Sequence, residues 1–132
     1  MVSHTACAAL HAHRRNLSDA QLRRVAAAGG IIGISLCPFF MAPGGAGVNL
    51  RTVVEHLLHA LEVAGERHVA LGTDLDGISR LPSGFRGVAD LPIIEAELAA
   101  CGVAPETISR IAWRNAARLL DAALNGIDDE SG

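Results

Sequence analysis

The sequence predicts an α/β protein, and more narrowly the C-terminal portion of a (β/α)8 TIM-type barrel: about three βα units plus a terminal helix. Short apolar runs over residues 31–36 and 68–73 have the composition of strands covered on both faces, and segments with helical periodicity follow or separate them. Alternating strands and helices imply a parallel sheet. A complete barrel needs about 250 residues. With 132 residues, the chain therefore matches the last part of a barrel.

Each helix has a recognisable start or stop. Ser18 and Gln21 form a capping box, Asn49 can cap the second helix, and Pro105 suits a first helical turn. We expect the last helix to bury a stripe formed by Ile108, Ile111, Ala112, Ala116, Leu119 and Leu120. The expected strands cover residues 1–5, 31–36 and 68–73, and the expected helices cover residues 19–28, 50–64, 92–101 and 105–124.

Composition excludes several classes of protein. Half of the residues are apolar and the mean hydropathy is +0.32, so the chain is not disordered. A net charge of −3 gives no reason to expect nucleic acid or an anionic membrane as a partner. We find no signal peptide and no apolar run long enough to span a bilayer. The three cysteines, Cys7, Cys37 and Cys101, are too widely spaced for a disulfide framework, which favours a cytoplasmic protein.

Two carboxylates, Asp74 and Asp76, follow the apolar run that ends at Leu71. In parallel α/β proteins, ligands gather at the carboxyl ends of strands. A pair of acids there can bind a metal, take a proton or hold an ammonium group. Asp-Gly is also ordinary turn chemistry, so this stretch alone leaves a turn as an equal alternative.

The ends of the other two strands would lie on the same side. His4 ends the first strand, and the second leads into a Pro/Gly-rich loop over residues 37–49 that carries Phe39 and Phe40. A lone histidine is usually structural, but an imidazole beside acids from a neighbouring strand suits zinc. The two phenylalanines are more often core residues than a substrate wall. For His11, His13, His56 and His59 we expect solvated or structural roles rather than metal binding.

Several motifs then occur in a characteristic order: Ser3-His4, Arg14-Arg15-Asn16-Leu17-Ser18-Asp19, Gly30-Ile31-Ile32-Gly33-Ile34 and Gly72-Thr73-Asp74-Leu75-Asp76-Gly77. They are followed by Asn115-Ala116-Ala117-Arg118-Leu119-Leu120. In order and spacing they resemble the C-terminal part of the membrane (renal) dipeptidase family of zinc peptidases. The resemblance extends from His4 to about Leu120.

The resemblance implies a metallopeptidase with two zinc ions in a distorted barrel, which hydrolyses dipeptides, sometimes with a C-terminal D-residue. By position, His4 corresponds to a zinc ligand, Arg15 to the arginine that holds the substrate carboxylate, and Asp74 to the acid beside the reactive water. Asp76 would bind substrate or orient Asp74 and its loop. A guanidinium suits a planar carboxylate because it can bind it through two parallel hydrogen bonds.

The resemblance also places the family's remaining zinc ligands upstream of this chain. One imidazole cannot hold zinc tightly, since hydrolytic sites use about three protein ligands. We therefore expect this polypeptide to be a truncated chain, inactive alone, with a partial metallo-dependent hydrolase barrel over residues 1–125 and a disordered acidic tail over residues 126–132. The alternatives are a non-catalytic half-barrel that associates with itself, as a homo-oligomer, or with a partner through exposed strand edges, and a barrel enzyme of the amidohydrolase type.

Overall fold

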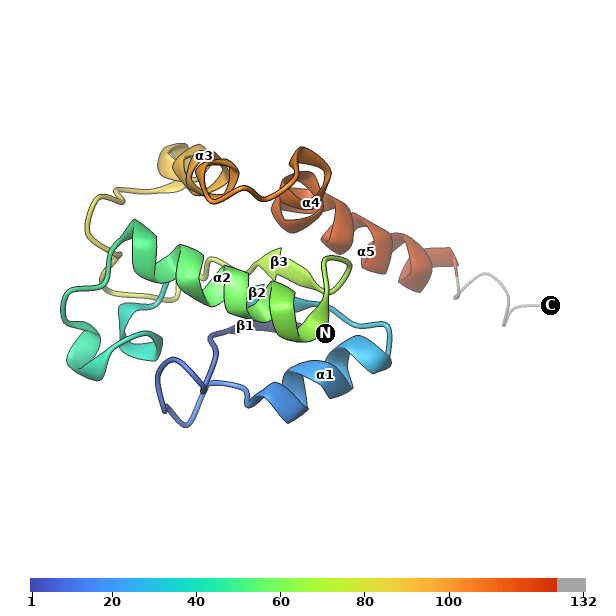
Figure 1. The fold of residues 1–132 in the computed structure, drawn as a ribbon, viewed down its shortest axis with the longest axis horizontal. Coiled ribbons are helices and arrows are strands. Elements are labelled where there is room, and N and C mark those ends of the chain that lie inside the picture. The colour runs from blue at the N-terminus through green and yellow to red at the C-terminus, as the bar shows by residue number, and fades with distance from the viewer. Residues whose placement is uncertain (126–132) are drawn as a thin grey trace.

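Three parallel strands form the centre of the computed structural model, which describes residues 1–125. Strands β1 (Val2–Thr5), β2 (Ile32–Ile34) and β3 (Val69–Leu71) lie side by side in that order (Figure 1). Ile32 pairs with Val69 and Ile34 with Leu71, in parallel register. The α/β class and the parallel pairing are as predicted. The predicted acidic tail lies outside the described residues.

Strand β1 carries an irregularity next to the predicted site. Val2 pairs with Ile32 and Thr5 with Ile34, so β1 uses one residue more than β2 over the same span. The backbone carbonyl of Ser3 consequently lies against Gly33 and Gly72, where the Cβ atom of any other residue would collide with it. A bulge of this kind can re-aim the side chain that it carries, and here that residue is His4.

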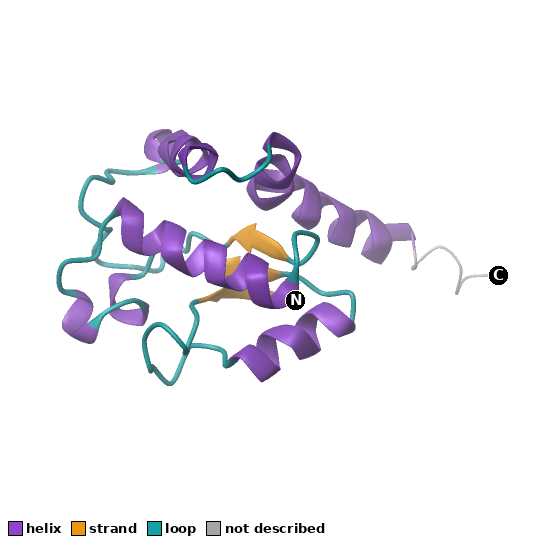
Figure 2. Cartoon of the chain, in the orientation of Figure 1, coloured by secondary structure: helices purple, strands orange, loops and turns teal. Residues whose placement is uncertain are grey.

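Helix α2 (Leu50–Ala64) packs across β2 and β3, with α1 (Asp19–Ala27) along one flank and α3 (Pro92–Ala100) along the other (Figure 2). Asn49 caps α2 and Ser18 caps α1, the latter with the predicted capping box. The core between these helices and the sheet consists of aliphatic side chains that are almost fully buried: Leu22, Ile32, Ile34, Val53, Leu57, Val69, Ile94 and Leu98.

The C-terminal helical segment differs from the prediction. It comprises α4 (Pro105–Ser109), a π-helical turn (Arg110–Arg114) and α5 (Asn115–Asn125). Ile108 and Ile111 are buried as predicted, but Ala116 and Leu120 are exposed. The π-helical turn inserts an extra residue and rotates the following helix, and α5 then extends beyond the sheet (Figure 1).

The sheet is also shorter than predicted, because regular pairing stops after three residues in β2 and β3. Backbone hydrogen bonds still continue beyond the strands, from the Ser35 N–H to the Thr5 carbonyl at 2.8 Å and from the Leu36 N–H to the Thr73 carbonyl at 3.3 Å. The loop over residues 37–49 is not structureless either, since it contains two short 3₁₀ turns, Pro38–Phe40 and Pro43–Gly45.

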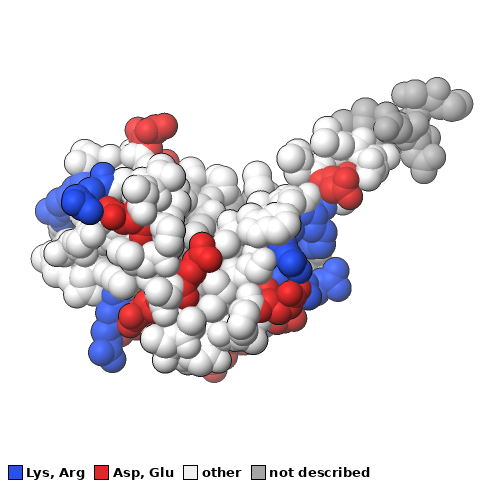
Figure 3. Space-filling view, turned by 90° about the horizontal axis from the view of Figure 1, so that it is seen from above, with Lys and Arg blue, Asp and Glu red and all other residues white. Residues whose placement is uncertain are grey.

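The surface carries charges of both signs. On the face in Figure 3, basic and acidic side chains lie next to one another. Among the ion pairs, Arg110 and Arg114 both contact Glu106, at 3.4 and 2.9 Å. None of the helices within residues 1–125 combines the length and the apolar character that crossing a membrane requires.

Candidate active site at the strand ends

The loops that follow the three strands lie on one side of the sheet (Figure 1). His4, at the end of β1, points its imidazole into this region with about one-third of the side chain exposed. Its Nδ1 atom lies 2.9 Å from the hydroxyl of Ser3. Its Nε2 atom faces two charged groups from distant parts of the chain, Arg15 and Asp74.

Arg15 is held on several sides. Its Nη2 atom lies 3.0 Å from His4 Nε2, and its guanidinium lies over the ring of Phe40, 5.7 Å from the centroid. Its carbonyl accepts a hydrogen bond from the Thr5 hydroxyl at 2.9 Å, and its backbone N–H donates to His13 Nδ1 at 3.2 Å. A guanidinium can only donate, so His4 Nε2 is the acceptor, which fits a neutral imidazole with its proton on Nδ1.

Asp74 occupies a special backbone conformation just beyond β3. Its φ is +56°, and no other described non-glycine residue has a positive φ. Gly77 donates its N–H to the Asp74 carbonyl at 2.9 Å and lies so close to the carboxylate that a side chain at position 77 would collide with it. Residues in sparsely populated backbone conformations cluster at functional sites. The turn directs Asp74 Oδ2 to within 4.0 Å of His4 Nε2.

His4, Arg15 and Asp74 therefore come together, although they are 11 and 59 residues apart in the chain. Asp76 is exposed, and within residues 1–125 it makes no hydrogen bond or ion pair. Gly77, rather than Asp76, packs against the Asp74 carboxylate. The assignment of Asp76 to substrate binding stays a prediction.

The aromatic ring of Phe40 lies beside Arg15, a contact that the sequence predicted only in part. The Phe40 ring contacts His13, with centroids 5.2 Å apart, as well as Arg15. The buried Asn16 side chain donates to the Phe40 carbonyl at 2.7 Å and to the His11 carbonyl at 2.8 Å. Phe39 is exposed and lies under Arg80. The sequence did not reveal that Asn16 and His13 contact Phe40, because these contacts join residues more than 20 positions apart.

The arrangement offers an imidazole, a carboxylate and a guanidinium at one rim. The guanidinium can bind an anionic group and the carboxylate can accept a proton. These residues alone do not form a complete zinc site, because within residues 1–125 no three His, Cys, Asp or Glu side chains converge as metal ligands. His4 and Asp74 supply one nitrogen and one oxygen, whereas hydrolytic zinc sites use three protein ligands.

Comparison with known proteins identifies the family. The family model described as membrane dipeptidase, peptidase family M19, matches residues 1–129. The chain belongs to the membrane dipeptidase family. Within this family it is 35% identical over 118 residues to an uncharacterised dipeptidase of Schizosaccharomyces pombe, an alignment that covers 89% of the chain and 29% of that protein. It is 33% identical over 121 residues to dipeptidase verJ of Clonostachys rogersoniana, covering 91% of the chain and 30% of that protein.

Solved structures of the membrane dipeptidase family share this fold. The crystal structure of dipeptidase AC, a metallopeptidase of family M19, matches with a TM-score of 0.82 and 30% identity, over 89% of this chain and 36% of that one. A metallopeptidase from Rhodobacter sphaeroides, crystallised with a phosphinate mimic of the dipeptide L-Ala-D-Ala, matches with the same TM-score and identity, over 89% and 34%. The chain thus spans about a third of the length of these family members.

Proposed function

We propose that this chain contributes the substrate-binding and proton-transfer groups of a zinc-dependent dipeptidase. The observation that carries this proposal is the convergence of Arg15 and Asp74 on the Nε2 atom of His4, at 3.0 and 4.0 Å, in a chain of the dipeptidase family. Nothing in the local sequence requires these three groups to meet.

Each group has a role that its chemistry suits. Arg15 binds the C-terminal carboxylate of a dipeptide through two parallel hydrogen bonds, and the Phe40 ring beneath it limits where that carboxylate can lie. Asp74 accepts a proton from the attacking water and returns it to the nitrogen of the leaving amino acid as the C–N bond breaks. His4 is proposed as one zinc ligand, and the other ligands would come from outside residues 1–125.

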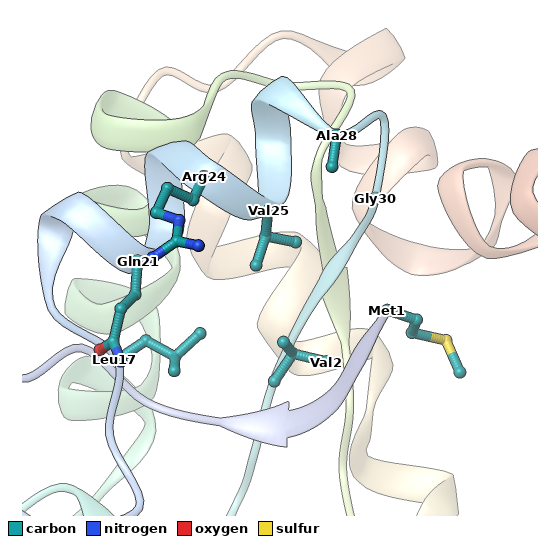
Figure 4. A pocket seen from close by; sticks show the side chains of 8 residues that line it. All are labelled: Met1, Val2, Leu17, Gln21, Arg24, Val25, Ala28 and Gly30. Atoms are coloured by element: carbon teal, nitrogen blue, oxygen red, sulfur yellow. The ribbon is translucent and has the colours of Figure 1, made fainter.

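The complete fold is proposed to be a (β/α)8 barrel. A surface recess of about 480 Å³ supports this, because it lies beside β1 and α1 at the flank where a preceding βα unit would pack (Figure 4). It is lined by apolar side chains, among them Val2, Leu17 and Val25, and by the polar side chains of Gln21 and Arg24. Its lining includes none of His4, Arg15 and Asp74, so we assign it a packing role rather than a catalytic one.

The substrate class follows from the same site. A C-terminal carboxylate is the group that Arg15 would recognise, and the Rhodobacter sphaeroides relative was crystallised with a mimic of L-Ala-D-Ala. We therefore propose dipeptides, including those with a C-terminal D-residue, as substrates.

The test is hydrolysis of L-Ala-L-Ala and L-Ala-D-Ala with added zinc, by the 132-residue chain and by a version fused to the N-terminal part of a family member. We expect turnover by the fusion and none by the chain alone. Arg15→Lys should raise KM, and Asp74→Asn should lower kcat by about 100-fold or more, the range of a lost proton-transfer group. Hydrolysis of cyclic amides or lactones but not dipeptides would refute the proposal, as would full activity in the Asp74→Asn variant.

A further inference from the structure

The segment that carries Arg15 is a closed loop. Leu17 donates its N–H to the Ala6 carbonyl at 3.0 Å, and Ala8 donates to the Leu17 carbonyl at 2.9 Å. The two ends of the loop, near Cys7 and Leu17, therefore lie side by side. The loop begins three residues after His4, and Arg15 lies close to its second end. Any shift of these ends would move Arg15 relative to His4.

Helix α2 contacts the first end of this loop, and the helix that follows its second end, through two histidines. His56 Nδ1 accepts the N–H of Cys7 at 3.0 Å, and the Cys7 thiol donates to the His56 carbonyl at 3.4 Å. His59 Nε2 lies 2.8 Å from the carboxylate of Asp19, in the first turn of α1. Residues three apart on a helix share one face, so His56 and His59 contact the segments before and after Arg15 from the same side.

The contact at Cys7 is buried and specific. His56 is 1% exposed and Cys7 is fully buried. A buried N–H left without an acceptor is destabilising, so the imidazole fixes the backbone of Cys7 more firmly than an apolar side chain of similar size would. Burial, reinforced by the nearby imidazoles of His59 and His11, lowers the pKa of His56 to about 4, which keeps the ring neutral and able to accept.

A metal-binding role does not explain these histidines. Each already has a protein partner, at 3.0 and 2.8 Å. The part of the chain that the structure describes brings no three His, Cys, Asp or Glu side chains together as ligands.

We propose that His56 and His59 are positioning residues for Arg15. His56 ties Cys7, the first end of the 7–17 loop, to α2, and His59 ties the start of α1, two residues beyond the second end, to the same helix. Together they clamp the loop to α2 and so set the place where the guanidinium meets substrate. The role of Arg15 in this inference rests on the proposed function. The clamp itself rests on contacts that do not depend on activity.

The first experiment measures amide hydrogen exchange in the 132-residue chain and compares two variants. His56→Asn keeps an acceptor near the position of Nδ1, whereas His56→Leu removes it at similar volume. We expect exchange in residues 7–17 to be about 10-fold faster in His56→Leu and within 2-fold of wild type in His56→Asn, with α3 unchanged. His68→Leu is the control, because His68 also bonds a backbone group, the Gly30 carbonyl at 2.8 Å, but that group lies outside residues 7–17.

The second experiment measures dipeptide kinetics in the active fusion protein. We expect His56→Leu to raise KM about 10-fold, with kcat within 2-fold, and His56→Asn to restore KM. In an Arg15→Ala background, His56→Leu should add less than a 2-fold further change, because the residue through which it acts is gone. A merely structural histidine would lower activity equally in both backgrounds.

The two experiments test different claims, so each can refute its own claim without affecting the other. If the wild-type fusion hydrolyses no dipeptide, the proposed function is wrong, and the exchange data still decide whether the clamp exists. If exchange in residues 7–17 is the same in His56→Leu and wild type, or if α3 loosens equally, the clamp is refuted whatever the activity.

Discussion

Asn115 gives the sharpest test of how the C-terminal helices are fixed to the sheet. Its side-chain amide donates to the carbonyls of Val69 and Glu66, both at 2.8 Å, and the residue is 2% exposed. The His68 carbonyl points toward β2, where it accepts from Ile32. By alternation the Val69 carbonyl points the other way, so Asn115 satisfies a group on the outer side of β3.

We expect Asn115→Leu, which keeps the size and removes the donors, to destabilise the protein. The Val69 carbonyl would be buried without this partner at a cost of about 1–3 kcal/mol. The Glu66 bond is only partly buried, so its loss costs less. Together they should lower the free energy of unfolding by about 2–4 kcal/mol, a large part of the about 5–15 kcal/mol that holds a domain folded.

The assay is urea unfolding followed by circular dichroism. Asn125→Leu is a matched control on the same helix, because Asn125 is exposed and, within residues 1–125, its side chain bonds only to Asp121, at 3.3 Å. It should shift the free energy of unfolding by about 0.5 kcal/mol or less. If Asn115→Leu is as stable as this control, the amide does not hold α5 to β3 and the reasoning fails.

Three further predictions concern buried groups. The pKa of His56 is lowered from 6.5 to about 4, so the unfolded chain binds more protons than the folded one and the stability of the fold falls as pH drops from 6.5 to 4. At about 1.4 kcal/mol per pKa unit the loss of stability is about 3 kcal/mol. Urea titrations at several pH values should show this loss in the wild type and not in His56→Asn. Burial raises the pKa of Cys7 to about 12, whereas Cys101 is exposed, so mass spectrometry after maleimide treatment should find Cys101 modified and Cys7 modified only in urea. Gly33→Ala should destabilise the protein by about 1–3 kcal/mol in urea unfolding, because its methyl group would meet the Ser3 carbonyl. Gly87→Ala, whose Cβ has open space, should be neutral in the same assay.

The caps and the helix boundaries were predictable because their signals are local. Ser18 with Gln21 and Asn49 with Thr52 satisfy the first turns of their own helices, and a chain needs no tertiary contact to favour them. The buried stripe of the last helix was partly wrong, because the π-helical turn over Arg110–Arg114 cannot be deduced from a pattern with a regular period.

The sequence by itself determined which chemical groups stand near the strand ends, since His4 lies in the last half of β1 and Asp74 comes three residues after the end of β3. Only the tertiary structure decided how these groups meet. The bulge at Ser3 depends on two glycines from other strands, Arg15 lies against the ring of Phe40, and the loop between them is tied to His56. These contacts join residues 25 to 69 positions apart, so no local preference encodes them; they form only when packing of α2 on the sheet brings the segments within reach.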